Sequence, residues 1–183
     1  MLPSEVPAQS SDVPVLYLIT STLSCKVFKV KVNVTPLITY DSSRVVTAPI
    51  TSVTPSTTNA VVAKLRVYVS GNAPTQPLNA TSITVGTTGT TNRNDISNLK
   101  VYYSGNSSTF NSSAIQFGST IAIPTAHNIV AGTTSLSQGD NYFWVTYDVK
   151  STATVNNYID ATIRSITTNA VARTPIDTAA VGN

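Results

Sequence analysis

Apolar and polar residues alternate along much of the chain, and Gly, Asn and Pro interrupt this alternation after short stretches. Between residues 63 and 69 every odd position is apolar, whereas Lys64, Arg66 and Tyr68 occupy the even positions. A period of two is typical of a β-strand with one buried face, and no stretch shows the period of an amphipathic helix. The pattern therefore predicts short strands separated by turns.

The same pattern recurs on both sides of this strand. Tyr142–Val149 (YFWVTYDV) has the strongest strand character, and Arg44–Val53 is predicted as an edge strand because Pro49 has no N–H to donate. Together the stretches predict an all-β protein, an antiparallel β-sandwich of the jelly-roll or immunoglobulin-like kind with about 8–10 short strands. Further strands are expected within residues 26–34, 82–86, 98–103, 115–123 and 129–130, around Leu136, and at 158–166.

This succession of strands divides the chain into three parts. Residues 1–39 form an N-terminal segment with one or two β-strands that we assign to no module. Residues 40–166 contain the regular strands and form the predicted sandwich module. Residues 167–183 are expected to be a linker or C-terminal extension.

Two octapeptides resemble each other, Leu65–Asn72 (LRVYVSGN) and Leu99–Asn106 (LKVYYSGN). They differ only where Arg is replaced by Lys and Val by Tyr. Either a hairpin unit was duplicated, or two strands end in the same turn chemistry, and two copies are too few for a solenoid or a propeller. In both octapeptides the central Tyr alternates with apolar residues, so we expect it to face away from the core.

The composition narrows the class of protein. Only 10% of the residues are charged, and Thr and Ser fill more than a quarter of the chain. Strong helix formers are scarce, which excludes a helical bundle, a coiled coil and a doubly wound α/β fold. The net charge of +3 comes from basic residues that are scattered singly, apart from Lys26, Lys29 and Lys31. Nucleic-acid binding needs a dense basic face, so we expect no nucleic-acid partner.

The sequence shows neither a membrane span nor a signal peptide. The run Val13–Leu23 is too short and too rich in hydroxyl groups to cross a bilayer, and the charged residues before it are acidic. We therefore expect no membrane insertion. The single cysteine, Cys25, cannot form an internal disulfide and is expected to be a small buried apolar residue.

Three aromatic residues are candidates for sugar binding, because the apolar face of a pyranose ring can lie on an exposed aromatic side chain. Tyr68 and Tyr102 alternate away from the core positions, and Trp144 alternates against the more apolar set on its strand. Asn106 would offer a side-chain amide to sugar hydroxyls. Two alternatives stay open: Trp144 is buried under a loop or a neighbouring sheet, and the tyrosines make ordinary cross-strand pairs.

Asn92, Asn94 and Asp95 in one loop, and Asp140 at a turn, are candidates for calcium binding, since Ca²⁺ binds oxygen ligands from carboxylates, amides and carbonyls. The alternative is that these side chains cap turns by accepting backbone N–H groups. No other cofactor is expected. His127, the only histidine, has no His or Cys nearby in the sequence to share a zinc ion, and no nucleophile elbow, P-loop or HExxH motif is present.

Four blocks of sequence carry a family resemblance: Gly89–Phe110, Gln116–Thr120, Gly139–Val149 and Asp160-Ala161. They resemble the N-terminal domain of BNR-repeat neuraminidases (sialidases), which is similar to modules of Bacteroidetes surface and secreted proteins. The resemblance covers residues 40–166. It implies a β-sandwich accessory module of an extracellular or cell-surface protein, with the neuraminidase activity in a separate β-propeller.

Catalysis by this chain is not expected. The Ser-x-Asp-x-Gly-x-Thr-Trp repeat of the propeller is not found here. A sialidase site also needs clustered arginines for the sugar carboxylate and a Tyr nucleophile with a carboxylate partner. The five arginines have no such context, and the only glutamate is Glu5.

Two hypotheses for the function remain. The first is a non-catalytic structural or adhesion unit, a spacer, stalk or filament subunit that joins neighbouring copies or adjacent modules by β-strand addition. It predicts a filled space between the sheets and an available edge strand. The alternative is a carbohydrate-binding accessory domain of a sialidase-like glycoside hydrolase, with glycans as ligands. It predicts a groove with exposed aromatic residues beside Asn or Asp.

Overall fold

The computed structural model describes residues 13–15, 28–30, 37–46, 52–71, 76–111 and 113–178, so that Cys25 and Pro49 lie outside the described residues. The chain divides into two units, residues 1–36 and 37–183. In the first unit, β1 (Val13–Val15) and β2 (Phe28–Val30) pair in antiparallel orientation. β2 lies inside the strand predicted at residues 26–34.

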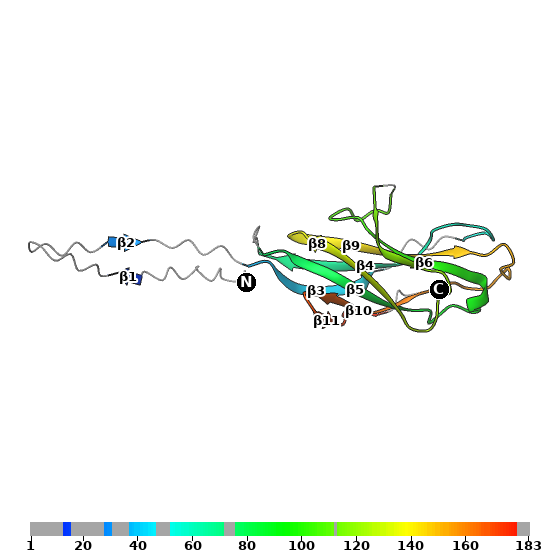
Figure 1. Ribbon diagram of the computed structural model, residues 1–183. Coiled ribbons are helices and arrows are strands. Elements are labelled where there is room, and N and C mark those ends of the chain that lie inside the picture. Colours follow the sequence, from blue (N-terminus) through cyan, green and yellow to red (C-terminus); the bar gives the residue numbers. More distant parts are fainter. Residues whose placement is uncertain are drawn as a thin grey trace, which may run out of the picture. The chain divides into compact units, whose positions relative to one another are not determined.

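The second unit consists of two antiparallel β-sheets that pack face to face (Figure 1). In the larger sheet, the ninth strand of the sequence pairs with both the fourth and the sixth strand. The five-stranded sheet contains, in spatial order, β3 (Thr39–Val46), β4 (Ala60–Ser70), β9 (Gly139–Val149), β6 (Ile96–Tyr103) and β7 (Ile115–Ile121). The four-stranded sheet contains β11 (Val171–Arg173), β10 (Thr162–Thr168), β5 (Leu78–Gly86) and β8 (Asn128–Leu136).

Apolar side chains from both sheets fill the space between them. Leu65 and Phe143 of the five-stranded sheet and Ile83 and Ile163 of the four-stranded sheet are at most 1% exposed. From Ala63 to Val69 in β4, burial alternates with the predicted period of two, and the odd positions point inward. Burying each such side chain stabilises the fold by about 1.5–3 kcal/mol relative to leaving it exposed. The predicted all-β antiparallel sandwich is confirmed.

The residues from 167 onward, expected to be a linker or C-terminal extension, continue the sandwich as far as the structure describes them. β10 runs to Thr168, and a turn at Asn169 and Ala170 leads into β11. Both turn residues have positive φ, as tight hairpin turns require, and Asn adopts this conformation readily. The turn escaped prediction because it contains no glycine.

The same C-terminal segment covers part of the edge strand β3. Ile176 N donates to Ser43 O at 2.8 Å, and Val45 N donates to Asp177 O at 3.0 Å. Thr178 O accepts from β10, so the segment bonds to both sheets. Because uncovered edge strands offer free N–H and C=O groups to other chains, these contacts protect β3 at Ser43 and Val45.

Two predicted strands begin elsewhere. β3 starts at Thr39 instead of Arg44, although its predicted edge position is confirmed. The last long strand starts at Thr162 instead of Tyr158. The residues before it bond to the loop after β5, where Thr91 N donates to Tyr158 O at 2.9 Å. The residues just before Thr162 therefore hold a loop in place by hydrogen bonding, although their sequence is typical of a strand.

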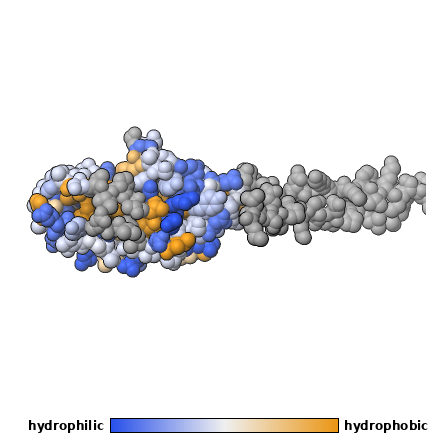
Figure 2. Space-filling view, turned by 180° about the vertical axis from the view of Figure 1, so that it is seen from behind, coloured by the Kyte–Doolittle hydropathy of each residue, from blue (hydrophilic) through white to orange (hydrophobic). Residues whose placement is uncertain are grey.

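The described part of the face drawn in Figure 2 is mostly polar. In the view of Figure 2, blue and white predominate among the described residues, and orange is confined to patches. Exposed large apolar side chains include Ile115, Ile123 and Ile129. With so few charges in the chain, hydroxyl and amide groups make most of the polar contact with water.

Candidate functional site

The outward side of the five-stranded sheet gathers most of the predicted site residues. β4 and β6 flank β9, with Lys64 and Tyr102 both opposite Trp144 and Tyr68 opposite Asp140. These side chains alternate with core residues and so point away from the core. We call this side the outer face; it comprises Lys64, Arg66, Tyr68, Lys100, Tyr102, Asp140, Tyr142, Trp144 and Asp148.

Trp144 is covered, although it points outward. It is 2% exposed, and its Nε1 donates to Ser104 Oγ at 2.8 Å. The Phe110 ring, in the loop after β6, lies 5.7 Å from the indole, and Lys64 Nζ lies 5.0 Å from it. The loop projects from the sandwich in Figure 1. Trp144 therefore offers no free face for a sugar, and the alternative of a buried tryptophan describes it correctly.

The two tyrosines at matching positions of the octapeptides differ in exposure. The Tyr102 hydroxyl donates to Asn59 Oδ1 at 3.2 Å, and its ring packs edge-on against Phe110 at 5.3 Å. Tyr68 is 43% exposed and lines a shallow hollow of about 220 Å³ with Ser42, Arg44 and Arg66. Of the three aromatic residues considered for sugar stacking, Tyr68 alone presents a large open face.

Asn106 stabilises the turn after β6 through side-chain hydrogen bonds. Its Nδ2 donates to Gln138 O at 3.3 Å and also to Asp140 O. These bonds tie the turn after β6 to the entry of β9, although Asn106 itself is exposed. The amide that was expected to bind sugar hydroxyls is thus already engaged with the backbone.

A polar cluster surrounds Lys100 on the outer face. Lys100 Nζ donates to both carboxylate oxygens of Asp148 at 3.0 Å and to Asn59 Oδ1 at 2.9 Å. Asn98 Nδ2 donates to Asp148 Oδ2 at 2.9 Å. The Lys100 and Asp148 side chains are each 16% exposed. We call Asn59, Lys100 and Asp148 the amine–amide cluster.

The charge state of this cluster follows from its contacts. Burial alone would raise the pKa of Asp148, but hydrogen bonds from the Asn59 backbone, Asn98 and Lys100 together hold it below its ordinary value. At neutral pH Asp148 is therefore a carboxylate, and Lys100 Nζ is its ion-pair partner. Lys100 is half of an ion pair that is largely shielded from water.

The four residues considered for calcium lie in two separate places, as their positions in the sequence suggest. Asp95 lies beside the C-terminal end of β9, where Lys150 N donates to its carbonyl at 2.9 Å. Asp140 lies at the opposite end of the same strand and pairs with Arg66, Nε to Oδ1, at 2.7 Å. The candidates therefore divide into the loop with Asp95 and the turn with Asp140, because the length of β9 separates the two carboxylates.

The remaining three candidates make a hydrogen-bonded turn. Asn92 Oδ1 accepts from Asn94 N at 3.0 Å and caps the 3₁₀-helix η1 (Arg93–Asp95). The Asp95 carboxylate accepts from Asn92 Nδ2 at 3.2 Å and from Asn157 Nδ2 at 2.6 Å. Within the described ranges, His, Cys, Asp and Glu residues form no group of three that would hold a metal ion.

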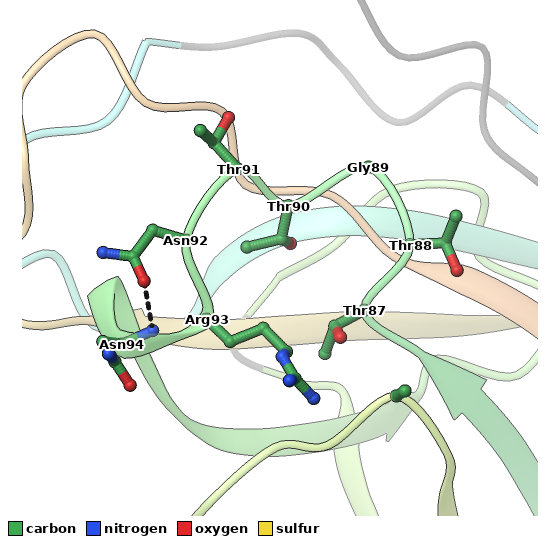
Figure 3. A pocket seen from close by; sticks show the side chains of 9 residues that line it. Thr87, Thr88, Gly89, Thr90, Thr91, Asn92, Arg93 and Asn94 are labelled. Atoms are coloured by element: carbon green, nitrogen blue, oxygen red, sulfur yellow. Dashed lines mark hydrogen bonds between the residues drawn. The ribbon is translucent and has the colours of Figure 1, made fainter.

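The loop before η1 encloses a polar hollow of about 450 Å³, lined by residues 87–94 and Ala126. Figure 3 shows the Arg93 side chain extending along the hollow toward Thr87, and the Asn92–Asn94 hydrogen bond at its rim. Gly89, with φ +94, lies against the Asp160 carboxylate, whose pKa is raised by burial. The hollow offers hydroxyl and guanidinium groups and no exposed ring.

The sequence alone did not predict that the residues of the amine–amide cluster lie close together. The available signal was the basic residue at the same place in both octapeptides, each on a strand beside β9. Arg66 forms an ion pair with Asp140, and Lys100 forms one with Asp148; both aspartates lie on β9. Asn59 gives no comparable signal, because it lies in a turn before β4 and reaches Lys100 only through the sheet pairing.

Among the residues that the structure describes, no helix has the length and apolar character needed to cross a membrane. The fold and the outer face define a small all-β module with a filled core and a polar surface.

The family follows from a sequence comparison. A family model described as the N-terminal domain of BNR-repeat neuraminidase matches residues 43–171, more than two thirds of the chain, and the chain belongs to this family. No curated protein matches the sequence. The matched domain is the sialidase-associated N-terminal domain and not the catalytic BNR repeat, and membership suggests a secreted or surface protein.

Proposed function

We propose that this chain is a non-catalytic structural and adhesion unit, a spacer, stalk or filament subunit of an extracellular protein. The proposal rests on one observation: two of the aromatic candidates for sugar binding make contacts within the fold instead. Trp144 lies under Phe110, and the Tyr102 hydroxyl bonds to Asn59. The core between the sheets is filled by apolar side chains. A rigid module with little charge suits end-to-end packing, since like charges would repel neighbouring copies.

Strand addition is the proposed mode of assembly. Among the described strands, β1 and β2 pair only with each other. A two-stranded sheet is marginally stable in water, so it gains from a third strand supplied by a neighbour. Main-chain hydrogen bonds would supply the affinity in such a contact, and the alternating side chains its specificity.

Sedimentation of the full chain over a concentration series tests this proposal. We expect the average mass to rise with concentration, and Val30→Pro in β2 to reduce the rise because proline removes a backbone donor. Val155→Ala, at a 72% exposed position in the second unit, serves as the control. A chain that stays monomeric at all concentrations would contradict assembly by strand addition.

A carbohydrate-binding accessory domain is the second candidate, and the hollow at Tyr68 is the observation in its favour. An exposed ring beside two guanidinium groups and Ser42 offers a stacking surface with polar partners. A glycan array tests it: saturable binding that Tyr68→Ala abolishes and Tyr158→Ala leaves intact would favour this function over the structural one. Tyr158 is the matched control because it is 63% exposed and does not line this hollow.

A further inference from the structure

The amine–amide cluster brings together three groups of complementary reactivity: an amine, a carboxamide and a carboxylate. Lys100 Nζ is 2.9 Å from Asn59 Oδ1 and 3.0 Å from both oxygens of Asp148. We propose that Lys100 and Asn59 join in an intramolecular amide bond with release of ammonia, and that Asp148 transfers the protons. The bond would link positions that are 41 residues apart in the sequence.

The backbone fixes all three groups in place. Lys100 lies on β6 and Asp148 on the neighbouring strand β9. Asn59 has φ +53, a left-handed conformation that is uncommon outside glycine, and its backbone N–H donates to Asp148 Oδ1 at 2.9 Å. Reacting groups held in contact behave as if at very high concentration, so even an unreactive amide becomes a feasible acyl donor.

The surroundings offer features that would assist the attack. Both side chains of the ion pair are 16% exposed, and Thr146, opposite Lys100 on β9, is fully buried. Desolvation by partial burial acts against the charged form of Asp148 and so opposes part of the effect of its hydrogen bonds, which still hold its pKa below the ordinary value. The Tyr102 hydroxyl donates to Asn59 Oδ1, the atom on which negative charge develops during attack.

The reaction proceeds by proton transfer, addition and elimination. A proton passes from Lys100 Nζ to the Asp148 carboxylate, and the freed lone pair attacks Asn59 Cγ while the carbonyl electron pair moves to Oδ1. Asp148 then gives its proton to Asn59 Nδ2 and takes one from Nζ. The Cγ–Nδ2 bond breaks, the carbonyl re-forms and ammonia leaves, taking up the proton on Asp148 as ammonium. Because the ion pair is the resting state, the step is slow, but each chain needs it only once.

Intact-mass spectrometry of the purified full chain, fresh and after prolonged incubation, tests the proposal. We expect a mass lower than that of the sequence by one molecule of ammonia. Trypsin does not cut after an acylated lysine, so the digest should lack cleavage at Lys100. It should contain peptide 45–64 joined to peptide 94–150, with the fragment spectrum placing the link between Asn59 and Lys100.

Three variants separate this bond from other losses of ammonia. Lys100→Arg removes the nucleophile, and Asn59→Gly removes the acyl donor while tolerating positive φ, so both should retain the full mass. Asp148→Ala should also retain it, with folding checked by circular dichroism. Asn156→Gly is the matched control, since Asn156 also has positive φ (+70) but is exposed in a turn, and it should still lose ammonia.

The opposite results overturn the proposal. A wild-type chain at the full sequence mass, cut by trypsin after Lys100, shows that no bond forms. Ammonia loss that persists in Lys100→Arg comes from a reaction that does not use the Lys100 amine, such as succinimide formation at an asparagine. A cross-link that forms as readily in folded Asp148→Ala removes Asp148 from the reaction. A product lighter by one water would instead join Lys100 to the Asp148 carboxyl and leave Asn59 out.

Discussion

The two octapeptides, Leu65–Asn72 and Leu99–Asn106, contrast in their surroundings although their sequences nearly coincide. Their strands, β4 and β6, flank β9 on opposite sides, and each sends a basic side chain to an aspartate of β9. The Arg66 and Asp140 side chains are 39% and 31% exposed, whereas those of Lys100 and Asp148 are 16% exposed. The same local pattern thus produces one solvated ion pair and one shielded ion pair.

The difference comes from the segment before β4, not from the octapeptides. This segment runs beside the C-terminal end of β9: Val149 N donates to Thr57 O at 2.8 Å, and Ser56 N donates to Val149 O at 3.1 Å. The segment places the Asn59 side chain within hydrogen-bonding distance of Lys100 Nζ. At Arg66, the equivalent space is the open hollow beside Tyr68. The reactivity of a strand position therefore depends on which distant turn covers it.

The largest expected effect separates Lys100 from Arg66. If the amide bond forms, Lys100→Arg removes a closed loop of 41 positions and should lower the free energy of unfolding by about 4 kcal/mol. Arg66→Lys keeps a charge at an exposed pair and should cost less than about 1 kcal/mol. Urea unfolding of the three proteins measures both values. Equal stability of the two variants would mean that no covalent link distinguishes these positions.

The inward faces should behave alike. Leu65 and Leu99 occupy matching positions and are both 0% exposed. Replacing either with Ala should lower the free energy of unfolding by about 3 kcal/mol through lost burial and a residual cavity. Urea unfolding in the Lys100→Arg background compares them without the cross-link. A difference well beyond the error would show that the contrast between β4 and β6 extends into the core.

The core-facing sides of the strands were also the features that the sequence predicted best. Period-two alternation predicted the sandwich, the core face of β4 and the outward direction of Tyr68, Tyr102 and Trp144, because strand geometry fixes side-chain direction locally. It did not predict that Phe110 covers Trp144, because that contact depends on how a loop folds over the sheet. Asn59 meets Lys100 for a similar non-local reason.

A smaller effect concerns acid stability. With a cation at position 100, the pKa of Asp148 in the folded chain is below its unfolded value, so its stabilising contribution is complete above about pH 4 and is lost as pH falls through the folded pKa. The cross-link would remove that cation and raise the pKa. Carboxyl NMR titration should therefore find Asp148 titrating at higher pH in wild type than in Lys100→Arg. The same midpoint in both proteins would indicate that Lys100 keeps its charge.

The smallest expected effect compares the two tyrosine hydroxyls. Tyr102→Phe removes a hydrogen bond to Asn59 Oδ1 and should lower the free energy of unfolding by about 1 kcal/mol. Tyr68→Phe should change it by less than about 0.5 kcal/mol, because Tyr68 is 43% exposed. Tyr102→Phe should also slow the formation of the amide bond, since the hydroxyl donates to the oxygen that becomes negative during attack. Timed mass spectra of freshly refolded chains measure that rate, and an unchanged rate would restrict Tyr102 to a packing role.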